Sequence, residues 1–270
     1  VNIAFFAAGP AVTRSYASRA VAAGCAVIDL SGGLPVDQAP NVVPEVNGAL
    51  LATLARPLQV ACPSPSAAAL ALVLSPLRDL LKIERVSVTA CLAVSSQGRE
   101  GVTELARQTA ELLNVRPLEP RIFDRQMAFN LLAQVGVPDA DGHVPLEKRL
   151  VSELRELLSL PLIKVGVSCI QVPVFFGDSL SVSMQTAEAL DLAAVNAALE
   201  SADGIELVEA GDYPTPVGDA VGQDAVYVGR LRQGIDDVCE LNFWVTSDNV
   251  RKGAALNAVQ VAELLIKDVA

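Results

Sequence analysis

Few side chains in this chain belong to types that perform covalent or acid–base chemistry. Five cysteines are widely spaced, with no C-x-x-C pair, and are Cys25, Cys62, Cys91, Cys169 and Cys239. An odd number at these spacings fits neither a disulfide framework nor a zinc site, so we expect no metal. The single histidine, His143, lies in a polar turn and is expected to be a solvated loop residue rather than a ligand or a base.

Ser64, Pro65 and Ser66 stand at the expected start of a long helix, where a hydroxyl nucleophile can be imagined. A serine nucleophile needs a base, and the only histidine is in a distant loop. Capping of the helix by the serines is therefore the favoured interpretation, with Pro65 in the first turn. Cys62, three positions before Pro65, is interpreted as a small buried hydrophobe rather than a relocated nucleophile. Cys91 and Cys169 are likewise interpreted as core residues.

The stretch from Ser247 to Ile266 predicts a loop that becomes a helix. Asp248 or Asn249 can cap it, and Gly253 allows close approach of the backbone to another group. An apolar stripe at helical spacing is formed by Ala258, Val261, Ala262 and Leu265.

The elements that must position these residues change character along the chain. The opening reads as strand, helix and strand over residues 1–9, 11–23 and 25–29, which predicts a parallel sheet with a right-handed crossover. No Gly-rich dinucleotide motif is present, because Gly32 and Gly33 lead into Pro35 and not into a helix. A further strand is expected at residues 58–61.

The second part mixes helices with strands that can pair antiparallel. Helices are predicted at 67–81, 101–113, 147–158 and 192–201, and strands at 86–95, 164–176, 180–186, 225–232 and 239–247. Residues 123–145 are expected to be irregular, and Gly177 with Asp178 to form a turn. Asp178 beside Ser179 could also be a base in new chemistry, which we consider the weaker alternative.

These patterns predict an α/β protein of two domains. A Rossmann-like parallel-sheet domain is expected over residues 1–64 with 249–270, and an α+β domain over residues 65–248. The last helix would then return to the first domain.

Composition and charge exclude several classes of protein. The 270 residues are 51% hydrophobic with a mean hydropathy of +0.41, yet no apolar run approaches the length of a membrane span. The net charge is −11 with no cluster of Lys and Arg, which argues against a nucleic-acid or anionic-membrane surface. With no segment resembling a signal peptide, a reducing cytoplasm is expected.

Several ordered motifs resemble those of the aspartate-semialdehyde dehydrogenase family. They are Val43-Pro44-Glu45-Val46-Asn47, Val228-Gly229-Arg230-Leu231-Arg232, Gln171 to Ser179, and the stretch from Ser247 to Ile266. Within the family the chain is most similar to the Usg-type proteins, a dehydrogenase-like branch, over residues 89–96, 98–101 and 107–113. The resemblance implies a Rossmann-like nucleotide-binding domain, an α+β dimerisation domain and an NADP-dependent oxidoreductase of amino-acid biosynthesis.

The resemblance also implies a set of reactive groups, and most of them are replaced here. The position of the nucleophilic cysteine holds Pro65, that of the glutamine holds Leu92, that of the substrate arginine holds Gln171, and that of the histidine holds Asp178. The phosphate-binding arginine is replaced by Pro35. In the predicted helix 147–158 the family's lysine falls on Arg149, which keeps a charge for substrate binding, and its glutamate falls near Leu146.

The family's cofactor-facing loop is matched by Asn249, Lys252 and Gly253. These residues either keep a vestigial nucleotide site or persist because they connect a strand to a helix; the sequence does not choose between the two. We expect no tightly bound NADP, and we expect the chain to start inside the first domain.

Three functions remain in view. The first is a homodimeric pseudoenzyme, a scaffold or partner-binding protein without the dehydrogenase activity, because loss of the thiolate removes covalent catalysis. The second is an active NAD(P)-dependent oxidoreductase that acts on an aldehyde or oxo group with altered residues. The third is a bare cofactor-binding or sensing module. Pro65, Gln171 and Asp178 favour the first over the second.

Overall fold

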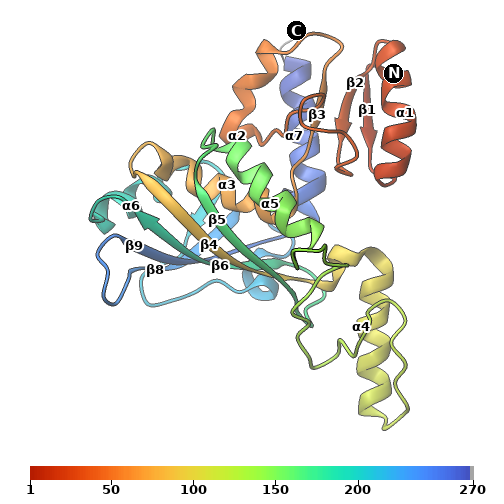
Figure 1. Ribbon diagram of the computed structural model, residues 1–270, viewed down its shortest axis with the longest axis vertical. Helices are drawn as coiled ribbons and strands as arrows, with labels where there is room; N and C mark the ends of the chain where they lie inside the picture. The colour runs from red at the N-terminus through yellow and green to blue at the C-terminus, as the bar shows by residue number, and fades with distance from the viewer. Residues whose placement is uncertain (268–270) are drawn as a thin grey trace.

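The computed structural model describes residues 1–267, and its strands form two separate sheets (Figure 1). The smaller is parallel, in the order β1-β2-β3, with bounds β1 Ile3–Phe6, β2 Ala26–Asp29 and β3 Gln59–Ala61. Helix α1 (Pro10–Ala22) connects β1 to β2, as the opening pattern predicts. The predicted parallel sheet is therefore confirmed.

The larger sheet is mixed and has the strand order β5-β4-β6-β9-β8-β7. Its strands are β4 Ile83–Leu92, β5 Lys164–Gln171, β6 Asp178–Thr186, β7 Ile205–Leu207, β8 Val226–Gln233 and β9 Glu240–Ser247. Pairs β4–β5 and β7–β8 are parallel and the others antiparallel. On β4 the buried Val86, Val88 and Ala90 alternate with the exposed Ser87 and Thr89, so one face is core and the other is open.

Helices cover the apolar face of this larger sheet. They are α3 Pro65–Arg78, α5 Pro145–Leu157 and α6 Leu192–Glu200, and they share one hydrophobic cluster with its strands. Helix α3 is buried almost all round because it lies between the sheet, α5 and α6. On the opposite face of β8 and β9, Trp244 Nε1 donates to the carbonyl oxygen of Pro214 at 3.0 Å, just before the π-helical turn Pro216–Ala220.

The smaller sheet has its own hydrophobic cluster, completed by the last helix, α7 (Leu256–Lys267). The predicted stripe of Ala258, Val261, Ala262 and Leu265 is buried there. A short helix α2 (Pro44–Asn47) and a 3-10 turn (Gly48–Thr53), neither of which the sequence predicts, lead from β2 towards β3. The chain thus returns at its end to the first sheet, as expected.

A projecting arm, residues 98–144, leaves the end of the larger sheet (Figure 1). It consists of α4 (Gly98–Leu113) and an irregular return, in agreement with the irregular segment that the sequence predicts. A small core joins Leu105, Met127, Ala128 and Leu132 of the arm to Val94, which precedes it. Buried Gln108 fixes the return, because its Oε1 accepts from Met127 N at 2.7 Å and Ala128 N at 3.1 Å.

Within residues 1–267, no helix has both the length and the apolar character needed to cross a membrane.

Candidate functional site

The family-matched positions meet where strands of the larger sheet end. Strand β4 ends at Leu92, which pairs in register with Gln171, the last residue of parallel β5. Antiparallel β6 begins beside the same point, since Cys91 pairs with Ser179. The topology therefore gathers Leu92, Gln171 and Asp178 at one edge, although they are far apart in sequence.

Asp178 is the first residue of β6, so the prediction that it belongs to a turn is wrong. Its carboxylate accepts a hydrogen bond from Ala93 N at 2.9 Å and is 3% exposed. That bond draws Asp178 into the sheet, and the turn lies in the residues before it. Burial raises the pKa of Asp178 to about 7, and the charge of Asp248 adds to the rise.

Gln171 is also buried, and its amide is used within the protein. Its Nε2 donates to the carbonyl oxygen of Leu92 at 2.7 Å and to Ser96 Oγ at 3.4 Å. A glutamine has no charge to offer a carboxylate or a phosphate. At the position where the resemblance implies a substrate-binding arginine, the side chain is therefore a neutral amide.

Pro65 is the first residue of α3, as predicted, and it lies against the loop that precedes α7. A Cβ added at Gly253 would lie 2.5 Å from Pro65 Cβ and 2.9 Å from Pro65 Cα, so the two backbones are in direct contact. The close approach expected of Gly253 is found, and the group it approaches is Pro65. The start of α3 thus holds a proline ring packed against Gly253, where chemistry would need a thiol.

Ser64 occupies the N-cap position of α3, but its hydroxyl does not cap the helix. Instead Ser64 Oγ donates to Glu153 Oε2 at 2.5 Å, and Ser64 N donates to the same oxygen at 2.8 Å. Arg149 Nε donates to the other oxygen, Oε1, at 2.6 Å. Glu153 outcompetes the helix for the serine because a charged acceptor makes the stronger bond.

Arg149 lies where the smaller sheet meets α5. Its side chain is 33% exposed, and its Nη2 reaches the carbonyl oxygen of Cys62, just beyond β3, at 3.4 Å. A Cβ added at Gly32 would lie 2.6 Å from Arg149 Nη1, so the guanidinium also rests on the loop after β2. Arg149 therefore stands at the carboxyl ends of two parallel strands, which is the ligand-binding edge of such sheets.

The loop before α7 has its polar groups engaged. Asn249 Oδ1 accepts from Gly177 N at 3.0 Å, and Asn249 Nδ2 donates to Ser95 Oγ at 3.0 Å. Asp248 Oδ1 accepts from Val250 N at 2.9 Å and from Arg251 N at 3.0 Å. The N-cap position of the π-helical turn Arg251–Ala255, which precedes α7, is Val250 and has no side-chain cap.

Lys252 is 2% exposed and fully paired. Its Nζ donates to both carboxylate oxygens of Glu45, at 2.6 and 2.7 Å, and to Gln260 Oε1 at 2.6 Å. Since an ammonium group has three donors, none is left for a phosphate.

The cysteines do not supply a thiolate at this edge. Burial raises the pKa of the Cys62 thiol to about 11 and that of Cys169 to about 12. Cys62 and Cys169 are core residues, as predicted, while Cys91 is only half-buried. His143 is exposed on the arm, in agreement with the expectation of a loop residue. No cluster of metal-ligating side chains occurs within residues 1–267.

Sequence reasoning missed Glu153 and Ser95 as members of this site. The spacing of Arg149 and Glu153, four residues apart on a predicted helix, indicates an ion pair on one face. Nothing in the sequence indicates that Ser64 or Asn249 would join the respective networks, because those bonds cross between distant segments.

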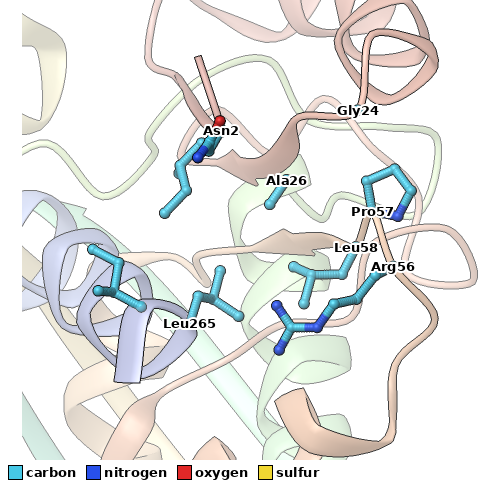
Figure 2. A pocket seen from close by; sticks show the side chains of 9 residues that line it. Asn2, Gly24, Ala26, Arg56, Pro57, Leu58 and Leu265 are labelled. Carbon is cyan, nitrogen blue, oxygen red and sulfur yellow. The ribbon is translucent and has the colours of Figure 1, made fainter. Parts of the chain in front are cut away.

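A separate cavity of about 630 Å³ lies at the opposite, amino edge of the smaller sheet (Figure 2). It is bordered by the starts of the three strands and the end of α7, and its lining is Asn2, Ile3, Gly24, Ala26, Arg56, Pro57, Leu58, Leu265 and Ile266. Leu265 and Ile266 belong to the matched stretch from Ser247 to Ile266, whereas Pro65, Leu92, Arg149, Gln171 and Asp178 do not line this cavity.

Comparison with known proteins gives the class. Residues 1–54 match the NAD binding domain of semialdehyde dehydrogenase, and residues 74–252 match the semialdehyde dehydrogenase dimerisation domain. The chain belongs to the semialdehyde dehydrogenase family, with its Rossmann-like and dimerisation domains.

The particular relatives fall into two groups. The chain is 61% identical to a USG-1 protein homolog of Azotobacter vinelandii, covering 99% of this chain and 80% of the relative. It is 42% identical to aspartate-semialdehyde dehydrogenase 2 of Vibrio cholerae, covering 99% and 80%. Among solved structures, a probable aspartate-semialdehyde dehydrogenase from Pseudomonas aeruginosa superposes with a TM-score of 0.97 at 58% identity, covering 100% and 81%. The resemblance to the family, including its USG-1 branch, is confirmed.

Proposed function

We propose that this protein is a dimeric member of the family that does not carry out the phosphorylating dehydrogenase reaction and acts as a scaffold or partner-binding protein. The observation that carries the proposal is Pro65 at the start of α3, in contact with Gly253. Proline has neither a nucleophilic side-chain atom nor a backbone N–H, so this position offers no nucleophile to attack a carbonyl carbon.

The groups gathered where β4 and β5 end and β6 begins support the same proposal. Gln171 is neutral, Leu92 is apolar, and Asp178 is a carboxyl bonded to the backbone. A base near Pro65 would have no thiol to deprotonate, so these replacements are mutually consistent.

The residues of the loop at 249–253 do not fit a tightly bound nicotinamide nucleotide. Lys252 has no donor left, Asn249 is bonded to Gly177 and Ser95, and Gly253 is occupied by Pro65. Of the two interpretations that the sequence leaves open, we favour the structural one, in which these residues connect β9 to α7. Arg149 is the group we retain as a candidate anion-binding residue.

We further propose the division into residues 1–64 with 249–270 and residues 65–248. The two hydrophobic clusters support it, since one contains β2, β3 and α7 and the other contains α3 with the larger sheet. Residues 268–270 of that assignment lie outside the described residues. A reducing cytoplasmic location is part of the proposal and is supported by five cysteines that are unpaired in the structure.

The direct test is turnover of the whole protein with aspartate semialdehyde, phosphate and NADP, followed by absorbance of the reduced nucleotide. We expect no rate above a control without protein, while the Vibrio cholerae relative serves as the active reference. Turnover clearly above the control would overturn the proposal and establish an oxidoreductase with rearranged residues.

Nucleotide binding is tested separately by calorimetric titration with NAD and NADP. We expect no heat of binding below millimolar nucleotide. Binding at micromolar nucleotide without turnover would replace the scaffold by a cofactor-sensing module.

A further inference from the structure

A second pocket, of about 310 Å³, lies at the root of the arm, next to Gln171. Its walls come from the end of the turn before α4, from the return of the arm and from β5. The lining residues are Gln97, Ile122, Phe123, Asp124, Leu132, Gln134, Val135, Gly136, Val137 and Gln171. The volume is at the lower end of the range of small-molecule sites.

The chemistry of this lining is unusual because it combines apolar walls with neutral amides. Three glutamines, at positions 97, 134 and 171, contribute carboxamides. The apolar surface comes from the isoleucine, phenylalanine, leucine and valine side chains of the arm's irregular return. Among residues 1–267 the only charged lining residue is Asp124, whose carboxylate is exposed and lies 3.4 Å from Arg125 Nε. No lysine, arginine or histidine of that part of the chain lines the pocket.

The hydrogen bonds within the protein determine what the amides can still offer. Gln171 Nε2 is used by Leu92 and Ser96, which leaves its carbonyl oxygen as an acceptor. Gln134 Nε2 donates to Gly136 O at 2.9 Å, which likewise leaves an acceptor. Gln97 is exposed, and both its donor and its acceptor can turn towards a ligand.

We propose that this pocket binds an uncharged, carboxamide-bearing small molecule whose N–H groups face Gln171 and Gln134 and whose carbonyl oxygen faces Gln97. An amide presents donor and acceptor side by side, which matches this arrangement. A carboxylate or phosphate has only acceptors and meets no cation among the lining residues, so its desolvation is not compensated. An ammonium group would have to compete with Arg125 for Asp124, the one charged lining residue. Replacement of the family's arginine by Gln171 thus changes which ligand charge this edge of the sheet accepts.

The test compares three probes of one shape and different charge: benzamide, benzoate and benzylammonium. Ligand-observed NMR with the whole protein is expected to show millimolar binding of benzamide and at least roughly fivefold weaker binding of the other two, the worth of one net hydrogen bond. Equal binding of benzoate, or no binding of benzamide at 10 mM (about ten times the expected Kd), would overturn the proposal.

Two variants locate the binding. Gln97→Leu keeps the size of an exposed side chain and is expected to weaken benzamide at least roughly fivefold, while Gln38→Leu, an exposed glutamine outside the pocket, changes nothing. Gln171→Arg is expected to shift preference to benzoate. Because Gln171 is buried, its variant is interpreted only with an unchanged circular dichroism spectrum. If Gln97→Leu leaves the affinity for benzamide unchanged, the probe binds elsewhere and the proposal is overturned.

This inference goes beyond the proposed function and does not depend on the lack of turnover. The dehydrogenase assay tests for turnover at the site of Pro65, whereas the probe titration tests for binding in the pocket that contains Gln97. Failure of one therefore leaves the other standing.

Discussion

At the residue scale, the replaced groups are integrated into the local structure rather than left unpartnered. Asp178 accepts a backbone amide, Gln171 donates to a backbone carbonyl, and Pro65 starts a helix. Asp178 and Gln171 thus each make a contact within the protein.

Asp178 makes a prediction about pH. Its pKa rises from 3.8 in the unfolded chain to about 7 in the folded protein, so the folded state binds this proton more tightly. Folding stability from this group is present at low pH and is lost as pH rises from about 4 to 7, by at most roughly 4 kcal/mol. Urea unfolding of wild type and Asp178→Asn at pH 5 and pH 8 measures it. We expect the variant to lose less stability between the two; an identical loss in both proteins would contradict the assignment.

Gly253 makes a prediction about packing. Gly253→Ala places a methyl group 2.5 Å from Pro65 Cβ, where only backbone movement can make room. We expect a loss of about 1–3 kcal/mol in the free energy of unfolding.

The control for that substitution is Gln38→Ala, which shortens an exposed side chain far from the Gly253 loop and from the open face of the larger sheet. Thermal or urea unfolding of both variants measures the difference in their free energies of unfolding. Equal stability of the two would show that the loop at Gly253 yields easily.

At the element scale, α5 is connected to the start of α3 by one carboxylate. Glu153 accepts from Ser64 N and Oγ and from Arg149, and its side chain is 5% exposed. A proline at the first position and a serine without a side-chain cap would leave this helix end poorly fixed. Glu153 supplies the missing acceptor from a neighbouring helix.

Glu153→Ala tests that connection. Removing the carboxylate leaves the buried Ser64 donors without partners, so we expect a loss of about 2–4 kcal/mol in the free energy of unfolding. Glu263→Ala, an exposed glutamate on α7, is the control and is expected to stay within about 0.5 kcal/mol. A small effect at Glu153 would mean that water satisfies Ser64.

At the scale of the whole molecule, the larger sheet has one face covered by helices and one face open. The open face of β4, β5 and β6 carries the small polar side chains of Ser87, Thr89, Ser168 and Ser181, and Gly166 lies among them. It lies within the residues that match the dimerisation domain of the family. A flat face without helices suits the packing of two copies, so we propose it as the centre of the homodimer interface.

Ser181→Lys tests this face, because Ser181 pairs in register with Thr89 at its middle. A two-fold interface brings every new charge in twice, so we expect at least about tenfold weaker dimerisation. Sedimentation velocity across a dilution series measures it. Ser201→Lys, exposed at the end of α6, should leave the dimer intact. A dimer unaffected by Ser181→Lys would move the interface elsewhere.

The sequence by itself determined the elements, because apolar spacing along a segment is a local property. The period of α7, the opening crossover and the irregular return of the arm could all be predicted from nearby residues. The family could also be predicted from the sequence, because its motifs are short runs of neighbouring residues; the replacement of its reactive groups stays a prediction from that resemblance. The short β7 and α2 were missed because three or four residues carry too little pattern.

Only the tertiary structure decided what each unusual residue does. The sequence predicts a turn at Asp178, but the antiparallel pairing of β4 and β6 brings its carboxylate within hydrogen-bond distance of Ala93 N. Ser64 looked like a cap until α5 brought Glu153 within reach. Gly253 predicted a close approach of the backbone to another group, and the structure shows that this group is Pro65. Hydrogen bonds act over about 3 Å in space, whatever the separation along the chain, so no local pattern could have specified these partners.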